Sequence, residues 1–533
     1  MAEILHREVV GYRSEVSVAP FIGAQVLESL TAGMYDNPLM IYREYVQNSA
    51  DSIDNAVTRG LIKRDQGHID IRVSGKDRSV IIEDNGAGIS VRDAVRVLVD
   101  IGNSDKDLHA QRGFRGIGRL GGLGYCDLLC FETRSDGDDR IAVIELDGKA
   151  LRRNLSELPR NLSLEEAVKI ICTRSYRDAE LTEPRHFFRV TLIGIRPFHD
   201  DCLLNIKMLR GYLSQVAPVP YNTKEFSFTE KISEHLRFVH GFQAYHLVVN
   251  GEQVVKPYAD TITLSATKDL TLEDAELFEF YSNDGDCLAR GWYARTEFSG
   301  ALPRGLGVRG IRVRQGNMQV GDEKILAECF KEPRFANWHV GELHVMNGHL
   351  RPNTRRDGFE QSAHYERFLE QSYLLGHQLS SMCRRAAEKR NIIRTAEMIL
   401  GSYEEFMTCS TLPDPEQAFM RIQSQARKIA SQIGKRFREE ELPPELLDRL
   451  ISIAGLVRNP GRSICFEKSF DGRVLRRYSK RQLLEDMIQR IREAHSSSHT
   501  SDELISRLLV GFLTPTAQRQ MKRASALGPK RKV

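Results

Sequence analysis

Apolar residues recur at helical spacing after Asn37 and predict one amphipathic helix that ends near Gly60. Asn37 and Pro38 suit the first turn of such a helix, and Gly60 suits a left-handed stop. The apolar positions follow one another at intervals of four, three and four residues: Val46, Ala50, Ile53 and Val57. We expect this stripe to pack on a sheet.

The opposite side of the same helix is polar and carries Glu44, Asn48 and Asp51. A carboxylate, a carboxamide and a second carboxylate on one face are suited to bind a hydrated metal ion and to orient a water molecule. Most polar helix faces are simply solvated, so the helix alone does not decide between these two interpretations.

The pattern then changes to alternation and predicts a β-hairpin. Two alternating runs flank the turn GKDR: Ile69, Ile71 and Val73, then Val80 and Ile82. The second run ends at Asp84 and continues into Asn85-Gly86-Ala87-Gly88. Glycines let a flat ligand approach the backbone and a carboxylate accepts a hydrogen bond, although a plain tight turn would have the same sequence.

A dense run of glycines, GFRGIGRLGGLG, occupies residues 113–124 and is suited to cradle phosphates through backbone N–H groups. Its letters GIGRLG match the dinucleotide-binding fingerprint, but that fingerprint must follow a strand, and here polar residues precede it. A P-loop motif is absent from the whole sequence. We therefore exclude both of these nucleotide-binding folds.

These segments, in this order, resemble the GHKL superfamily of ATPases, which comprises gyrase, the ninety-kilodalton heat-shock chaperone (Hsp90), histidine kinases and MutL. The run REYVQNSAD at residues 43–51 is most similar to the Hsp90 branch, and GFRG at residues 113–116 is more similar to MutL. The resemblance implies an α+β protein with a Bergerat-type α/β sandwich ATPase domain, a mixed α/β middle domain and a helical C-terminal region. We place these parts at residues 1–230, 231–360 and 361–533.

The resemblance also implies that the chain binds ATP with Mg²⁺. It gives Glu44 the role of polarising the attacking water, Asn48 that of holding magnesium, and Asp84 that of accepting a hydrogen bond from the adenine amine. Gly88 would line the adenine pocket, and Thr191, in the strand-like run FRVTLIG, would help Asp84, although a strand threonine is also simply a good β former. The other nucleotide-binding residues that we expect are Asp51, Gly113, Gly116, Gly118 and Gly121. Lys106 could reach a phosphate, although a lysine in a loop is more often simply solvated. A lid is expected from Gly102 to Gln111.

The loop Asn353-Thr-Arg355-Arg356-Asp357 echoes a motif of the Hsp90 middle domain, in which an arginine reaches the γ-phosphate. A cation supplied from another domain makes hydrolysis depend on domain closure, because phosphoryl transfer builds negative charge. Arg356 fits this register best, and Arg355 is the alternative. An exposed basic cluster with Arg351 is the competing interpretation.

Four further residues invite a metal interpretation: His339, Glu342, His344 and His349. Their spacing matches no zinc pattern. We therefore predict that they are strand surface residues.

Composition sets the outer bounds. The chain has 533 residues, 41% of them hydrophobic and 28% charged, with a net charge of +4, so composition alone does not indicate nucleic-acid binding. Nine cysteines without a C-x-x-C pair indicate reduced thiols and a cytoplasmic location. No run of eighteen apolar residues and no signal peptide is present, so no membrane association is expected.

Together these features predict an ATP-hydrolysing, chaperone-like clamp that acts on protein partners and forms a homodimer when ATP binds. In the resembled chaperones, an N-terminal strand like residues 1–18 crosses to the partner. The alternative is a nucleic-acid-associated clamp of the MutL or MORC kind, in repair or anti-phage defence. The basic residues near the C-terminus leave that alternative open.

Overall fold

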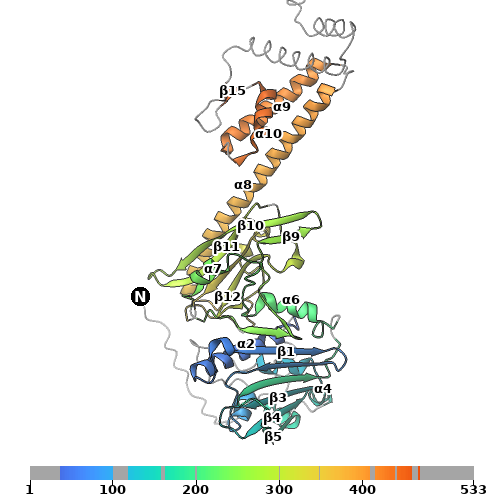
Figure 1. The fold of residues 1–533 in the computed structure, drawn as a ribbon, viewed down its shortest axis with the longest axis vertical. Coiled ribbons are helices and arrows are strands. Elements are labelled where there is room, and N and C mark those ends of the chain that lie inside the picture. The colour runs from blue at the N-terminus through green and yellow to red at the C-terminus, as the bar shows by residue number, and fades with distance from the viewer. Residues whose placement is uncertain are drawn as a thin grey trace, which may run out of the picture. The chain divides into compact units, whose positions relative to one another are not determined.

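The computed structural model describes residues 37–99, 118–157, 163–197, 201–239, 241–298, 300–346, 348–353, 355–408, 414–438, 441–455, 457–458 and 466–467 (Figure 1). The chain divides into two compact units, Met1–Cys383 and Arg384–Val533. The predicted N-terminal strand, the predicted lid with Lys106, the first glycines of the glycine run (Gly113 and Gly116) and the basic C-terminal tail lie outside the described residues.

The predicted amphipathic helix is α2, Met40–Thr58. Asn37 caps the turn that leads into it, because its Oδ1 accepts a hydrogen bond of 3.0 Å from the N–H of Leu39. Gly60 adopts a φ of 72°, which is the left-handed stop expected. Val46 and Ile53 are fully buried, so the predicted apolar stripe is confirmed.

An eight-stranded sheet lies beneath α2 in the order β5-β4-β3-β6-β2-β1-β7-β8 (Figure 1). The strands are β1 His68–Ser74, β2 Ser79–Asp84, β3 Leu128–Arg134, β4 Arg140–Asp147, β5 Cys172–Asp178, β6 Phe187–Ile193, β7 His246–Val249 and β8 Glu252–Gln253. All neighbours pair antiparallel except β1 and β7. The predicted hairpin is β1–β2, and the strand-like runs after residue 126 are confirmed as β3, β4 and β6.

Helices cover this sheet and share one hydrophobic core with it. Besides α2 they are α3 Ala94–Val99, α4 Gly148–Glu157, α5 Leu164–Ile171 and α6 Ile206–Val216, with the 3₁₀ turns η1 Arg64–Gln66 and η2 Gly118–Gly124. Strands β7 and β8 come after the predicted boundary at residue 230, yet they extend this sheet because β7 pairs with β1.

A second sheet of six strands has the order β13-β12-β14-β11-β10-β9. Its strands are β9 Thr261–Ser265, β10 Lys268–Tyr281, β11 Cys287–Thr296, β12 Gly310–Gln315, β13 Met318–Gln319 and β14 Val340–Val345. Helix α7, Thr229–Leu236, packs on β10 and β11, and three 3₁₀ turns lie between strands: η3 Arg304–Leu306, η4 Ala327–Cys329 and η5 Pro333–Trp338. Trp292, Phe226 and Tyr258 form the aromatic centre of this core.

The remainder is mainly helical, as predicted. Helix α8, Ala363–Thr408, contributes its second half to the C-terminal unit, together with α9 Pro415–Arg436, α10 Pro444–Ala454 and the short strands β15 Val457–Arg458 and β16 Phe466–Glu467. Leu447, Leu450 and Ile451 are buried in its core, which confirms the predicted helical stripe. No helix in the described part of the chain is both long enough and apolar enough to cross a bilayer.

Candidate active site

Asp84 ends β2 and is 1% exposed. Its Oδ1 accepts a hydrogen bond of 3.0 Å from the N–H of Gly86. Its Oδ2 is also buried and meets the geometric criterion for a hydrogen bond with none of the described residues, although the hydroxyl groups of Ser49 and Ser52 are close by. Burial raises the pKa of the carboxyl to about 7, although the nearby hydroxyl groups of Ser49 and Ser52 act to lower it. A buried acceptor of this kind is suited to a ligand N–H donor.

The turn after Asp84 is pressed against the surrounding chain. A Cβ on Gly86 would lie 2.1 Å from Oγ of Ser52, and one on Gly88 would lie 1.9 Å from the carbonyl oxygen of Arg134. Gly88 also has a φ of 64°, which disfavours other residues. Both glycines are therefore required by packing of the chain on itself, which holds Asp84 in a fixed place beside α2.

The polar face of α2 carries the three residues predicted there. Glu44 and Asn48 are partly buried, and Asp51 is 6% exposed. Gly118, the first described residue of the glycine run, packs against this face, because a Cβ on Gly118 would lie 2.5 Å from Oε2 of Glu44. Gly121, the other described member of the predicted set, is buried in η2. Oxygen ligands such as these suit Mg²⁺, which retains several of its waters.

Thr191 does not lie beside Asp84, and this part of the prediction is wrong. The register pairs Asp84 with Phe188, whereas Thr191 pairs with Ile81. Residues paired across strands share a face, and successive residues alternate. Thr191 therefore points to the opposite face of the sheet from Asp84.

Thr133 of β3 lies on the same face of the sheet as Asp84. It pairs with Phe188, so it lies in the same row as Asp84, two strands away. Its buried Oγ1 accepts a hydrogen bond of 2.8 Å from the N–H of Ile89 and donates one of 3.1 Å to the carbonyl oxygen of Phe187. Thr133 thus fixes the end of the Asp84 turn. Its alternation with Leu129 and Phe131 in the sequence was a signal that it faces the core.

Arg356 reaches the polar face of α2 from the loop that follows β14. Its Nε lies 3.6 Å from Oε1 of Glu44, and the two side chains are 13% and 12% exposed. Its Nη1 donates a hydrogen bond to Oε1 of Gln47, a residue that sequence reasoning did not select although it lies one helical turn from Glu44. Arg355, by contrast, is exposed.

The backbone of this loop is held in place. Pro352 and Phe359 form a β-bridge, and the carbonyl oxygen of Arg356 accepts a hydrogen bond of 2.8 Å from the N–H of Gly321. Arg356 has a φ of 56°, an uncommon conformation for a residue with a side chain. Such a conformation persists only where its surroundings fix it, so the position of the Arg356 backbone is determined by the loop and by the segment after β13.

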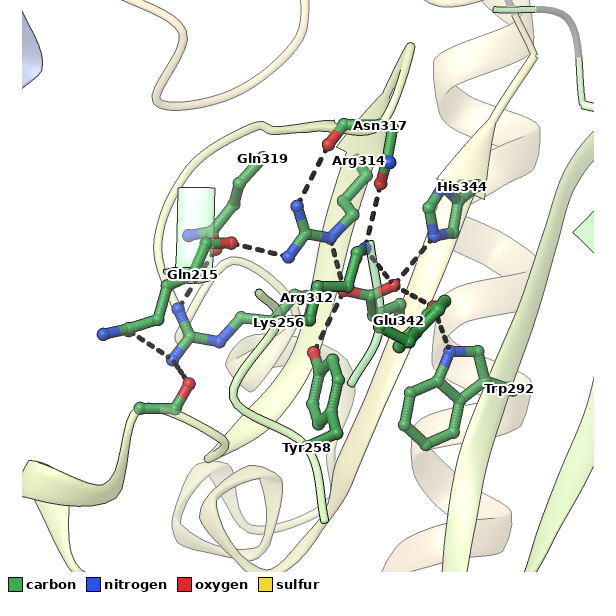
Figure 2. A network of polar contacts seen from close by, with 12 residues as sticks. Gln215, Lys256, Tyr258, Trp292, Arg312, Arg314, Asn317, Gln319, Glu342 and His344 are labelled. Atoms are coloured by element: carbon green, nitrogen blue, oxygen red, sulfur yellow. Dashed lines mark hydrogen bonds and ion pairs between the residues drawn. The ribbon is translucent and has the colours of Figure 1, made fainter. Parts of the chain in front are cut away.

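A buried polar network lies behind this loop and centres on Glu342 of β14 (Figure 2). Its carboxylate accepts hydrogen bonds of 2.8 Å from Lys256 Nζ and 2.5 Å from the hydroxyl of Tyr221, and Arg314 Nε lies 2.5 Å away. Burial lowers the pKa of His344 to about 4, so this histidine is neutral at pH 7. Burial, with the charge of Arg314 as the next cause, also lowers the pKa of Lys256 to about 7.

The prediction that His339, Glu342 and His344 are strand surface residues is therefore wrong. All three are at most 1% exposed. The burial of Glu342 is explained by partners distant in the sequence, since Lys256 and Arg314 offset its charge, and His344 in turn contacts Glu342. Within the described residues, no group of histidine, cysteine and acidic side chains is arranged to hold a metal ion.

Hydrogen bonds connect this network to Arg356. Arg312 donates to Oε1 of Gln319 at 3.1 Å, and Nε2 of Gln319 donates to the carbonyl oxygen of Gly321 at 2.9 Å. Arg312 also donates to Gln215 of α6 at 3.1 Å, as Figure 2 shows. The second sheet, α6 and the Arg356 loop are thus joined through buried and partly buried polar contacts.

Comparison with known proteins identifies the first part of the chain. Residues 41–171 match the family described as histidine kinase-, DNA gyrase B-, and HSP90-like ATPase. These residues form a GHKL-type ATPase domain. They include α2, the Asp84 turn and the described part of the glycine run, and a domain of this type binds ATP.

Individual relatives are chaperones. The chaperone protein HtpG of Psychrobacter arcticus is 29% identical over 133 residues, which cover 22% of this chain and 20% of that protein. HtpG of Acinetobacter baylyi is 29% identical over 132 residues, with 21% of each chain covered, and HtpG of Polaromonas sp. is 26% identical over 151 residues, with 25% and 23% covered. The chain thus spans only about a fifth of the length of these relatives, so the likeness is Hsp90-like in the ATPase domain alone.

Proposed function

We propose that the protein is an ATP-dependent, Hsp90-like molecular chaperone or conformational clamp that binds and hydrolyses ATP with Mg²⁺. The observation that carries this proposal is the meeting of Arg356, from the loop after the second sheet, with Glu44 on α2 of the ATPase domain. Arg356 belongs to the part of the chain that contains the second sheet, whereas Glu44 belongs to the ATPase domain. An arginine placed in this way would make hydrolysis depend on contact between these two parts.

Adenine recognition is assigned to Asp84. Its Oδ2 is buried without a partner in the described structure and would accept a hydrogen bond from the exocyclic amine. The glycines of the turn and Thr133 hold the backbone around it. A buried acceptor left empty costs free energy, so the amine gains affinity by satisfying it.

Glu44 is assigned to orient and polarise the attacking water, and Asn48 is assigned to hold magnesium, with Asp51 close by on the same helix. Bound Mg²⁺ would neutralise phosphate charge. Arg356 would stabilise the negative charge that develops on the transferring phosphoryl group, which is a role of arginine in other phosphoryl-transfer enzymes. Arg355 is exposed, which favours Arg356 for this role.

Protein clients and a homodimer that closes when ATP binds complete the proposal, since the relatives that match the ATPase domain are named chaperones. The test is ATP turnover in Mg²⁺, measured by phosphate release, together with suppression of aggregation of an unfolded test protein. Turnover with nucleotide-dependent suppression would support the chaperone. Tight, ATP-enhanced and steeply salt-dependent binding to long duplex DNA would instead establish a nucleic-acid clamp.

A further inference from the structure

We propose that Gln47 is the positioning residue for Arg356, a role that rests on the proposed ATP hydrolysis. Gln47 is 1% exposed and its Oε1 accepts a hydrogen bond from Nη1 of Arg356. The contact to Glu44 is longer, 3.6 Å from Nε, and is an ion pair without hydrogen-bond geometry. The direct hydrogen bond of the guanidinium to α2 therefore runs to the carboxamide and not to the carboxylate.

The two ends of the arginine are controlled separately. The loop contacts at Pro352, Phe359 and Gly321 fix its backbone. Beyond the backbone, an arginine side chain has several rotatable bonds and loses considerable freedom when it is held in one place. Gln47, rigid because it is buried in the middle of α2, supplies the acceptor that orients the far end.

A carboxamide is well suited to this position because it is neutral. A carboxylate at residue 47 would form a full ion pair with Arg356 and compete with the phosphate for the guanidinium. An aliphatic side chain would leave the guanidinium without its acceptor on α2. With glutamine, Nη1 is held by a neutral acceptor, and because guanidinium donors point in fixed directions this contact also orients the rest of the fork beside Glu44.

The test is steady-state ATP turnover by the full chain with Gln47→Ala, Gln47→Glu and Gln47→Met, the last of which keeps the volume of the buried side chain. We expect each variant to lower kcat by about tenfold, the effect of losing or altering one charge-assisted hydrogen bond in the transition state, with nucleotide Kd unchanged. Gln253→Ala, which removes an exposed glutamine from β8, is the matched control and should retain wild-type kcat.

A double-mutant cycle separates positioning from a general effect on stability. If Gln47 acts through Arg356, Gln47→Ala should reduce kcat no further once Arg356→Ala is present. Thermal unfolding without nucleotide should show the same pair to be coupled, because the contact exists in the unliganded chain. If the Gln47→Ala variant does not fold, the same double-mutant cycle is measured with Gln47→Met in its place.

The possible outcomes distinguish the positioning role of Gln47 from the proposed ATP hydrolysis on which it rests. A wild-type chain that binds ATP but releases no phosphate would overturn the proposed hydrolysis and this role with it. A hydrolysing chain in which the Gln47 and Arg356 effects on kcat multiply independently would overturn the positioning role alone. A Gln47 variant that changes the nucleotide Kd and leaves kcat unchanged would also overturn the positioning role.

Discussion

Replacing Asp84 by asparagine should have opposite effects on ligand binding and on stability. Burial raises the pKa of Asp84 from 3.8 to about 7. The folded chain therefore holds a proton between about pH 4 and pH 7 that the unfolded chain has released, and the free energy of unfolding falls as the pH rises through that window. Above pH 7 the ionised carboxylate costs on the order of 4 kcal/mol, at about 1.4 kcal/mol per pKa unit.

Asparagine removes this cost, because it carries no charge at any pH. Its amide N–H₂ would take the place of the unpartnered Oδ2 or of Oδ1, and a buried donor without an acceptor costs about 1–3 kcal/mol. We therefore expect the Asp84→Asn variant to be more stable than the wild type by roughly 1–3 kcal/mol at pH 8. The difference should shrink as the pH falls towards 5. Urea unfolding at several pH values measures it.

ATP binding should be lost in the same variant, by about 100-fold or more, since an amide donor would face the adenine amine, itself a donor. Isothermal titration calorimetry gives the affinity. An unchanged Kd would refute the adenine role of Asp84. A stability difference that does not depend on pH would refute the description of Asp84 as a buried carboxyl with a raised pKa.

Four further predictions test the remaining assignments. Glu44→Ala should keep ATP affinity and lower turnover by roughly 100-fold, and equal phosphate release would remove its catalytic role. Arg356→Ala should also slow turnover strongly without changing Kd, whereas the exposed Arg355 should tolerate alanine; the reverse result would move the role to Arg355. Glu342→Gln should lower the free energy of unfolding by about 3–5 kcal/mol in urea, because Lys256 and Arg314 lose their buried counter-charge, and a neutral effect would contradict the network. Small-angle scattering should show closure or dimerisation with a non-hydrolysable ATP analogue, and identical profiles would argue against a clamp.

Local periodicity predicted the elements that carry the site. Helix α2 and the β1–β2 hairpin follow from the spacing of apolar residues, which depends only on neighbours in the sequence. The placement of Asp84 at a strand end followed from the same pattern. The family resemblance indicated an arginine at residue 355 or 356 that would reach the nucleotide site. In the structure, Nε of Arg356 lies 3.6 Å from Oε1 of Glu44.

The errors concern contacts between distant segments. The side chain of Thr191 alternates with the buried Val190 and Leu192, so it lies on the other face of β6, and only the pairing of β6 with β2 shows that this is also the face opposite to Asp84. Glu342 and His344 were predicted at the surface because they are polar, but Lys256 and Arg314, far away in the sequence, make their burial tolerable. Gln47 was passed over because nothing local marks a glutamine as a partner for a loop 309 residues later.

The return of β7 and β8 to the first sheet limits how the two sheets can move. The chain leaves the first sheet after α6, and Tyr221 and Ile232 join the second core. It comes back at β7, pairs with β1, and leaves again after β8, with Tyr258 once more in the second core. Three covalent crossings therefore join the two layers, where a simple linker would make one. A single crossing would permit a swivel in any direction, whereas three crossings restrict the relative motion of the two layers and therefore also limit how far Arg356 can move from Glu44.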